Sequence, residues 1–129
     1  MPQAHSSFTL DSFEQAPLDE TGEVQLGSAT FHKTFTGDIA ATSVVHMLSA
    51  GRSDAPLAYI ALELVTGSLH GSVGTFVLRH EGSMAAGAAV NELEVVPGSG
   101  TGELKDITGT AVITHNGGGQ QLAMTYELP

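Results

Sequence analysis

Short runs of alternating apolar and polar residues, each ended by a turn signal, occupy most of this chain. No window shows a sustained helical period. Regularly spaced alternating runs are typical of antiparallel sandwiches and barrels. Beyond a first strand, the alternation predicts strands at Ser28–Thr36, Ile39–Ala50, Leu57–Thr66, Ser72–Glu81, Ala88–Val96, Thr108–His115 and Gln120–Leu128. The irregular, acidic segment Ala16–Gly27 is predicted to be the loop between the first two strands.

Length and charge limit the classes of function that fit. The 129 residues predict a single domain, 1–129. Four Lys and Arg against 14 Asp and Glu give a net charge of -10, which repels phosphate backbones and anionic membranes. The absence of cysteine excludes disulfides and thiolate sites. Because of this charge, we expect a protein that binds neither nucleic acid nor membrane. Because Met1–Ser7 does not resemble a secretory signal, we expect it to be cytoplasmic.

Two-residue turns predict which side chains share the inner face of each hairpin. A turn at Gly37-Asp38 would pair Thr36 with Ile39. The inner face would then hold Phe31, Lys33, Phe35, Ala40, Thr42, Val44, His46 and Leu48. Gly74 and Gly109 fall inside runs and predict bulges or bends in the wall.

A second turn, at His70-Gly71, would bring Tyr59, Ala61, Glu63 and Val65 to one face with Gly74, Phe76, Leu78 and His80. The opposite face of this hairpin is also apolar, so its inner side stays open. Two apolar faces indicate a cavity on one side and a subunit interface on the other. We therefore expect a homo-oligomer. In the last hairpin, Leu122, Met124 and Tyr126 share the apolar side with Ala111, Ile113 and His115.

Lys33 is the strongest candidate for chemistry, because it lies between Phe31 and Phe35 on an apolar face. A buried ammonium needs a partner, and Glu63 is the best one available. The pair could orient a carbonyl or carboxylate, or move a proton. The alternatives are a structural ion pair, or a lysine whose ammonium reaches water at the rim.

His80 lies near Glu63 across the predicted hairpin and is a candidate general base, or else a rim histidine. His46 is a weaker candidate of the same kind. Tyr59 and Tyr126 could donate hydrogen bonds to a substrate, or could be core residues with satisfied hydroxyls. The predicted catalytic set is Glu63, Lys33, His80 and Tyr126, and the predicted substrate-binding set is Phe31, Phe35, His46, Tyr59, Phe76, Leu78 and Met124. We expect no metal and no cofactor.

Several stretches carry a resemblance to a known family: Lys33–Asp38, Tyr59–Gly71, Gly74–Met84 and Val95–Leu104. From about Phe8 to its end, the chain resembles a bacterial family of small uncharacterised proteins whose fold is similar to plant allene oxide cyclase. The resemblance implies an eight-stranded antiparallel β-barrel that tends to oligomerise. The plant enzyme steers ring closure of an unstable epoxide in an apolar barrel without a cofactor. Its catalytic residues have no identified counterparts in this sequence.

The leading hypothesis is a cofactor-independent cyclase or isomerase that acts on a small hydrophobic molecule inside the barrel. Apolar walls would fold the substrate, Lys33, His80 or Tyr126 would stabilise an oxyanion, and Glu63 would shuttle a proton. Two alternatives remain. One is a non-catalytic binding protein for a small lipophilic ligand, and the other is a structural barrel whose interior is packed solid.

Overall fold

The computed structural model describes residues 2–20, 22–52, 55–83, 90–116 and 119–129, and its fold is all-β with one short 3-10 turn. The elements, in order, are β1 (Gln3–Asp19), β2 (Val24–Gly37), β3 (Ile39–Arg52), β4 (Ala55–Leu69), β5 (Ser72–Ser83), β6 (Val90–Val95), η2 (Gly102–Leu104), β7 (Thr108–Asn116) and β8 (Gly119–Glu127). Within these residues, no helix has the length and hydropathy that crossing a membrane requires.

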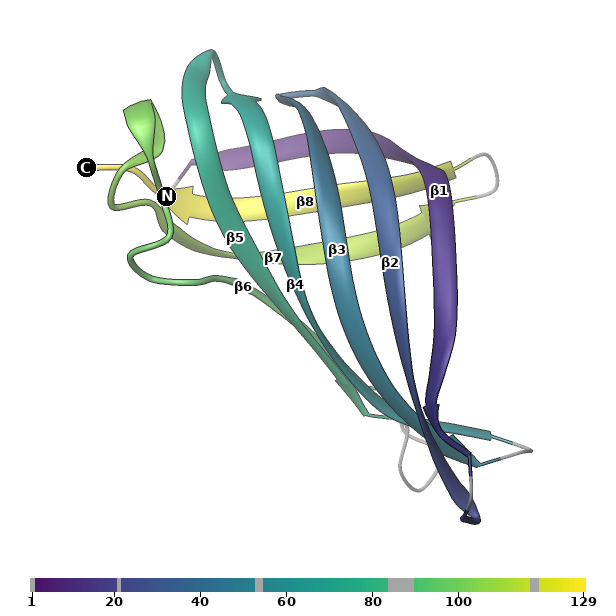
Figure 1. Cartoon of the computed structure of the whole chain (residues 1–129). Coiled ribbons are helices and arrows are strands. Elements are labelled where there is room, and N and C mark those ends of the chain that lie inside the picture. Colours follow the sequence, from purple (N-terminus) through teal and green to yellow (C-terminus); the bar gives the residue numbers. More distant parts are fainter. Residues whose placement is uncertain (1, 21, 53–54, 84–89, 117–118) are drawn as a thin grey trace.

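The eight described strands pair in chain order around a ring, and β1 pairs with β8 to close it (Figure 1). Every pairing is antiparallel, as the alternating runs predict. Between β6 and β7 the ladder is short and contains Leu93↔Ala111 and Glu94↔Thr110. The prediction of an all-β fold with eight antiparallel strands is confirmed.

The register predicted for β2 and β3 is wrong by one residue. Phe35 lies opposite Ala41, and Lys33 lies opposite Ser43. Gly37 adopts a φ of 121°, and the Asp38 carboxylate accepts a hydrogen bond from the backbone N–H of His5, 2.9 Å away on β1. This connection is one residue longer than a two-residue turn, so β3 presents its other face to the interior.

The two later hairpins follow the predicted registers. Glu63 lies opposite Leu78 and Ala61 opposite His80, on either side of the turn at His70-Gly71. Both turn residues have positive φ, 47° and 85°, which matches the twist of a two-residue hairpin. At the end of the chain, Ala111 lies opposite Met124. The predicted pairing of inner faces is confirmed for both hairpins.

The first hairpin is longer than predicted. Most of the Ala16–Gly27 segment is strand rather than loop, because β1 continues to Asp19 and β2 begins at Val24. β1 pairs with β8 only from Gln3 to Phe8, whereas its pairing with β2 continues to Asp19. The far parts of β1 to β4 therefore project past β8 as a curved sheet (Figure 1). The described side chains from Ala16 to Leu26 are exposed on both faces of this hairpin, so burial does not impose the alternation that predicts a strand.

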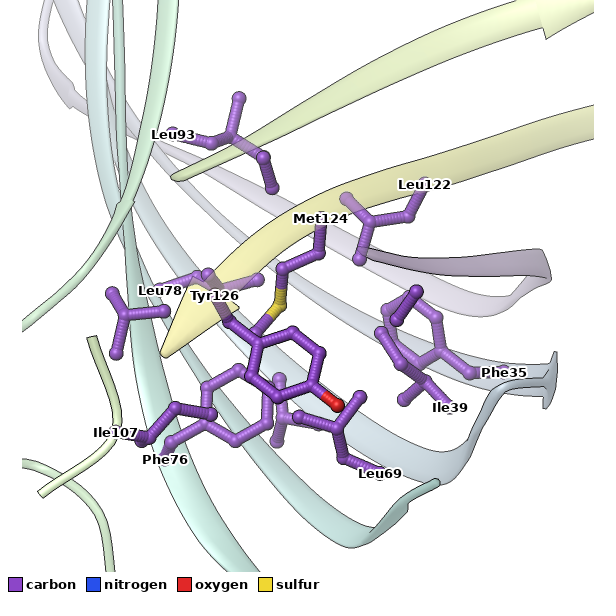
Figure 2. Packing of buried hydrophobic residues seen from close by; sticks show 14 of the residues in the cluster. Phe35, Ile39, Leu69, Phe76, Leu78, Leu93, Ile107, Leu122, Met124 and Tyr126 are labelled. Atoms are coloured by element: carbon purple, nitrogen blue, oxygen red, sulfur yellow. The ribbon is translucent and has the colours of Figure 1, made fainter. Parts of the chain in front are cut away.

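One end of the ring is packed solid. Figure 2 shows the ring of Tyr126 among Leu69, Phe76 and Met124, and all four side chains are at most 5% exposed. The segment that follows β6 covers this end with Leu104 and Ile107, which are 1% and 0% exposed. Each such buried side chain contributes about 1.5–3 kcal/mol to folding.

Gly74 and Gly109 do not interrupt the strand registers, so the predicted bulges are absent at these two described positions. Gly74 instead allows a close approach. A methyl group on it would overlap the backbone oxygen of Thr101, whose chain is fixed by N–H···O bonding to Thr75 at 2.9 Å. Gly74→Ala should therefore lower the free energy of unfolding by about 1–3 kcal/mol, as measured by urea denaturation.

Gly119→Ala is the matched control, because a methyl group there meets no atom within 4 Å. We expect its effect to stay within about 0.5 kcal/mol. Equal stability of the two variants would contradict the close contact between Gly74 and Thr101.

Candidate functional site

A buried carboxylate organises the interior beside the packed end. Glu63 is 1% exposed, and three side chains, one each from β2, β3 and β5, surround its two oxygens. Nε2 of His80 lies 2.7 Å from Oε1, Nζ of Lys33 lies 3.5 Å from Oε1, and the Ser43 hydroxyl donates to Oε2 at 2.6 Å. A buried charge is tolerable only when it is paired and hydrogen-bonded in this way.

The surroundings of Glu63 keep it ionised. Burial alone would raise the pKa of its carboxyl group. The hydrogen bond from His80, the charge of Lys33 and the hydrogen bond from Ser43 outweigh burial, so the pKa lies below its ordinary value of 4.5. Because an ionised carboxylate can only accept hydrogen bonds, Nε2 of His80 carries the proton it shares with Glu63.

Lys33 and His80 connect this carboxylate to a pocket of about 510 Å³, and both line its wall. Each is 6% exposed. The ammonium of Lys33 also lies 4.5 Å from the ring centroid of Phe8, within the range of a cation–π contact. Glu63 is not among the lining residues. The Glu63 carboxylate therefore lies behind the pocket wall, where it positions the side chains of Lys33 and His80 at the pocket surface.

The wall of the pocket is otherwise mostly apolar and comes from six strands besides β2 and β5. Its described lining residues are Phe8, Leu10, Phe31, Lys33, Val45, Met47, Tyr59, Ala61, His80, Leu93, Ala111, Val112, Ile113 and Gln120. No carboxylate belongs to this set, although the chain contains 14 Asp and Glu. The pocket therefore presents hydrogen-bond donors on an apolar wall, which suits a ligand with an apolar body and an oxygen acceptor.

The structure brings together some of the predicted site residues and separates others. Lys33, Glu63 and His80 meet as predicted, and Phe31 and Tyr59 line the pocket. The remaining buried members, Phe35, Phe76, Leu78, Met124 and Tyr126, belong to the hydrophobic core and do not line the pocket. Burial, followed by the charge of Asp38, raises the pKa of the Tyr126 hydroxyl.

His46 is misplaced by the register error in β3. Its side chain is exposed, and its residue lies opposite Leu62, which is itself 54% exposed. The predicted register places Ser43 and Val45 on the outer face, but both face the site, and Met47 on the same side of β3 also lines the pocket. The alternation of β3 could not have revealed them, because apolar residues occur on both of its faces.

Phe8 was missed because no register was predicted for the first strand. In the structure it lies opposite Phe35, with the two ring centroids 5.3 Å apart. Among the described residues, no group of three or more His, Asp or Glu side chains is arranged to hold a metal ion.

Comparison with known proteins gives a family and a similar structure. The model of a family described as "Protein of unknown function (DUF3224)" matches residues 4–128. A crystal structure of a protein with unknown function from the DUF3224 family of Shewanella oneidensis MR-1 is 34% identical to the chain, with a TM-score of 0.84. The similarity covers 100% of this chain and 98% of that one. No curated protein matches the sequence.

Replacing the buried carboxylate should destabilise the fold. Glu63→Gln leaves Lys33 and His80 without their anionic partner, so we expect the free energy of unfolding at pH 7 to fall by about 3–5 kcal/mol in urea denaturation. The control is Glu94→Gln, which removes the exposed 3.4 Å pair with Arg79 and should cost less than about 1 kcal/mol.

The same pair of proteins gives a pH test. The pKa of Glu63 is lower in the folded chain than in the unfolded chain, so the ionised carboxylate stabilises the fold. This contribution to the free energy of unfolding is complete above pH 4.5 and is lost as the pH falls through the folded-state pKa. The stability gap between wild type and Glu63→Gln should therefore narrow on acidification below 4.5. A gap that widens there would contradict a lowered pKa.

Proposed function

The chain belongs to the DUF3224 family, whose function is unknown, and from that premise we propose that it is a cofactor-independent isomerase or cyclase acting on a small hydrophobic molecule in the pocket. The observation that supports this most is a pocket with an apolar wall at whose surface a buried carboxylate holds one imidazole and one ammonium. The ring of eight antiparallel strands is compatible with an allene oxide cyclase-like barrel, which forms part of this proposal.

His80 is the general base in this mechanism. In the neutral ring, with the Nε2 hydrogen directed to Glu63, Nδ1 is the acceptor nitrogen. A carboxylate that fixes the tautomer and also stabilises the imidazolium is a common arrangement for proton abstraction. Glu63 is then a positioning residue rather than the proton shuttle, because its oxygens already accept from His80, Lys33 and Ser43.

Lys33 stabilises the negative charge that develops on the ligand. The substrate would place a carbonyl oxygen near the ammonium and an adjacent C–H near His80. His80 takes the proton, the C–H electron pair moves into the carbonyl, and the oxyanion forms beside Lys33. In a β,γ-unsaturated ketone, the oxyanion pair re-forms the C=O bond while the γ-carbon takes the proton back from His80, which gives the conjugated isomer. In a substrate with a second carbonyl, the enolate carbon attacks that carbonyl carbon, the π-electron pair of its C=O bond becomes an alkoxide, and the alkoxide takes the proton from His80, which gives a hydroxylated ring. Neither outcome requires a co-reactant.

A non-catalytic binding protein for a lipophilic ligand would use the same pocket. It would need the apolar wall and Lys33, but not the geometry of His80 against Glu63. A wholly packed interior does not fit the 510 Å³ pocket. The two remaining functions are therefore separated by a measurement of proton transfer.

Proton abstraction can be measured before the natural substrate is known. A panel of lipophilic ketones in D₂O should lose α-proton NMR signal faster with the wild-type protein than with buffer. His80→Gln should slow this exchange by at least about 100-fold, the usual contribution of a general base. The control, His46→Gln, changes an exposed histidine on the outer face and should leave the rate unchanged.

Binding is measured in parallel with the fluorescent probe 1-anilinonaphthalene-8-sulfonate. A wild-type protein that binds the probe competitively with the ketones but exchanges no proton would contradict the enzyme and favour the binding protein. Equal loss of exchange in His46→Gln would contradict the assignment of His80 as the base.

A further inference from the structure

A continuous aliphatic surface covers the outside of the sheet, on the face opposite Glu63. Its members come from β1 to β4, and each is 44–59% exposed: Leu18, Leu26, Leu48, Ile60, Leu62 and Leu64. Register places Leu48 directly opposite Ile60. A hollow of about 280 Å³ lies between the first four, lined also by Gly27, Ser49, Ala50, Ala58 and Tyr59. We call these six side chains the outer patch.

The outer patch lacks the charge that dominates the rest of the chain. β2, β3 and β4 contain 14, 14 and 15 residues, and the carboxylate among them is Glu63, which is buried on the inner face. The whole chain nevertheless carries 14 Asp and Glu and a net charge of -10. Apart from the buried Glu63, acidic residues are thus absent from β2 to β4, where five of the six members lie; the sixth, Leu18 on β1, is next to Asp19.

The chain also exposes more surface than its size requires. Its accessible surface is 7450 Å², about 1,000 Å² more than the roughly 6,500 Å² expected for a compact monomer of 13.3 kDa. Leu18 and Leu26 lie in the part of the first hairpin beyond Phe8, where the pairing of β1 with β8 has ended. A stable protein–protein interface needs about 800 Å² from each partner.

From these observations we propose that the outer patch is the interface through which this chain binds a second copy of itself. Two copies that each carry a net charge of -10 repel one another wherever carboxylates approach. The carboxylate-free face of β2 to β4 is the surface on which they can touch without that repulsion. An aliphatic face is also complementary to itself, as an interface that uses the same patch on both subunits must be.

Sedimentation equilibrium of the full chain tests this proposal. The wild-type protein at micromolar concentration should have at least twice the 13.3 kDa mass of one chain. Leu62→Glu puts a carboxylate within the patch, beside Ile60 and Leu64 on the same face of β4, and should raise the dissociation constant by about 30-fold or more, as for an interface hot spot. Val73→Glu makes a comparable change at a 58% exposed residue on β5, outside the patch and outside the pocket wall, and should leave the mass unchanged.

Circular dichroism of each variant establishes that its β-structure is intact, and Leu48→Glu repeats the test on the neighbouring strand. A wild-type protein that stays at 13.3 kDa overturns the proposal. So does an oligomer that survives both Leu62→Glu and Leu48→Glu, or one that Val73→Glu disrupts equally. These outcomes are independent of proton transfer in the pocket.

Discussion

A carboxylate that is almost wholly withdrawn from water constrains this structure more than any other group. Glu63 on β4 is stable there only because β2, β3 and β5 each supply a donor to it: Lys33, Ser43 and His80. A shift of one residue in any of these strands would turn its donor to the outer face and leave a buried charge unpaired. The cluster therefore fixes the mutual register of four strands while it holds Lys33 and His80 at the pocket wall.

The chemistry-bearing centre was predictable because turn chemistry fixes register over short distances. The turn at His70-Gly71 has the positive φ values of a two-residue hairpin, so the pairing that brings His80 to Glu63 follows from the sequence. The turn at Gly37 contains the same kind of residues, but Asp38 is held by β1 and the connection is one residue longer. Local sequence patterns cannot predict that contact between distant residues, and the longer connection turns the other face of β3 to the interior.

The position of each inward side chain along the axis of the ring was not predictable from the sequence. Alternation indicates which side of a strand faces inward, but not how far along the interior a side chain lies. Tyr126 and Met124 point inward as expected, yet they fill the end that Ile107 closes (Figure 2). Phe31 and Tyr59 point inward in the same sense and line the open pocket. The interior thus divides into a packed end that supplies stability and a pocket where polar groups meet an apolar wall.

Glu63 stays ionised behind the pocket wall and orients the imidazole of His80 and the ammonium of Lys33. A ¹³C NMR titration of the Glu63 side-chain carboxyl in the wild-type protein tests it directly, with Glu63→Gln used to assign the signal. Burial opposes ionisation, while His80, Lys33 and Ser43 favour it and prevail, so the titration midpoint should lie below 4.5. A midpoint above 4.5 would mean that burial prevails, and the arrangement of charges described for this site would be wrong.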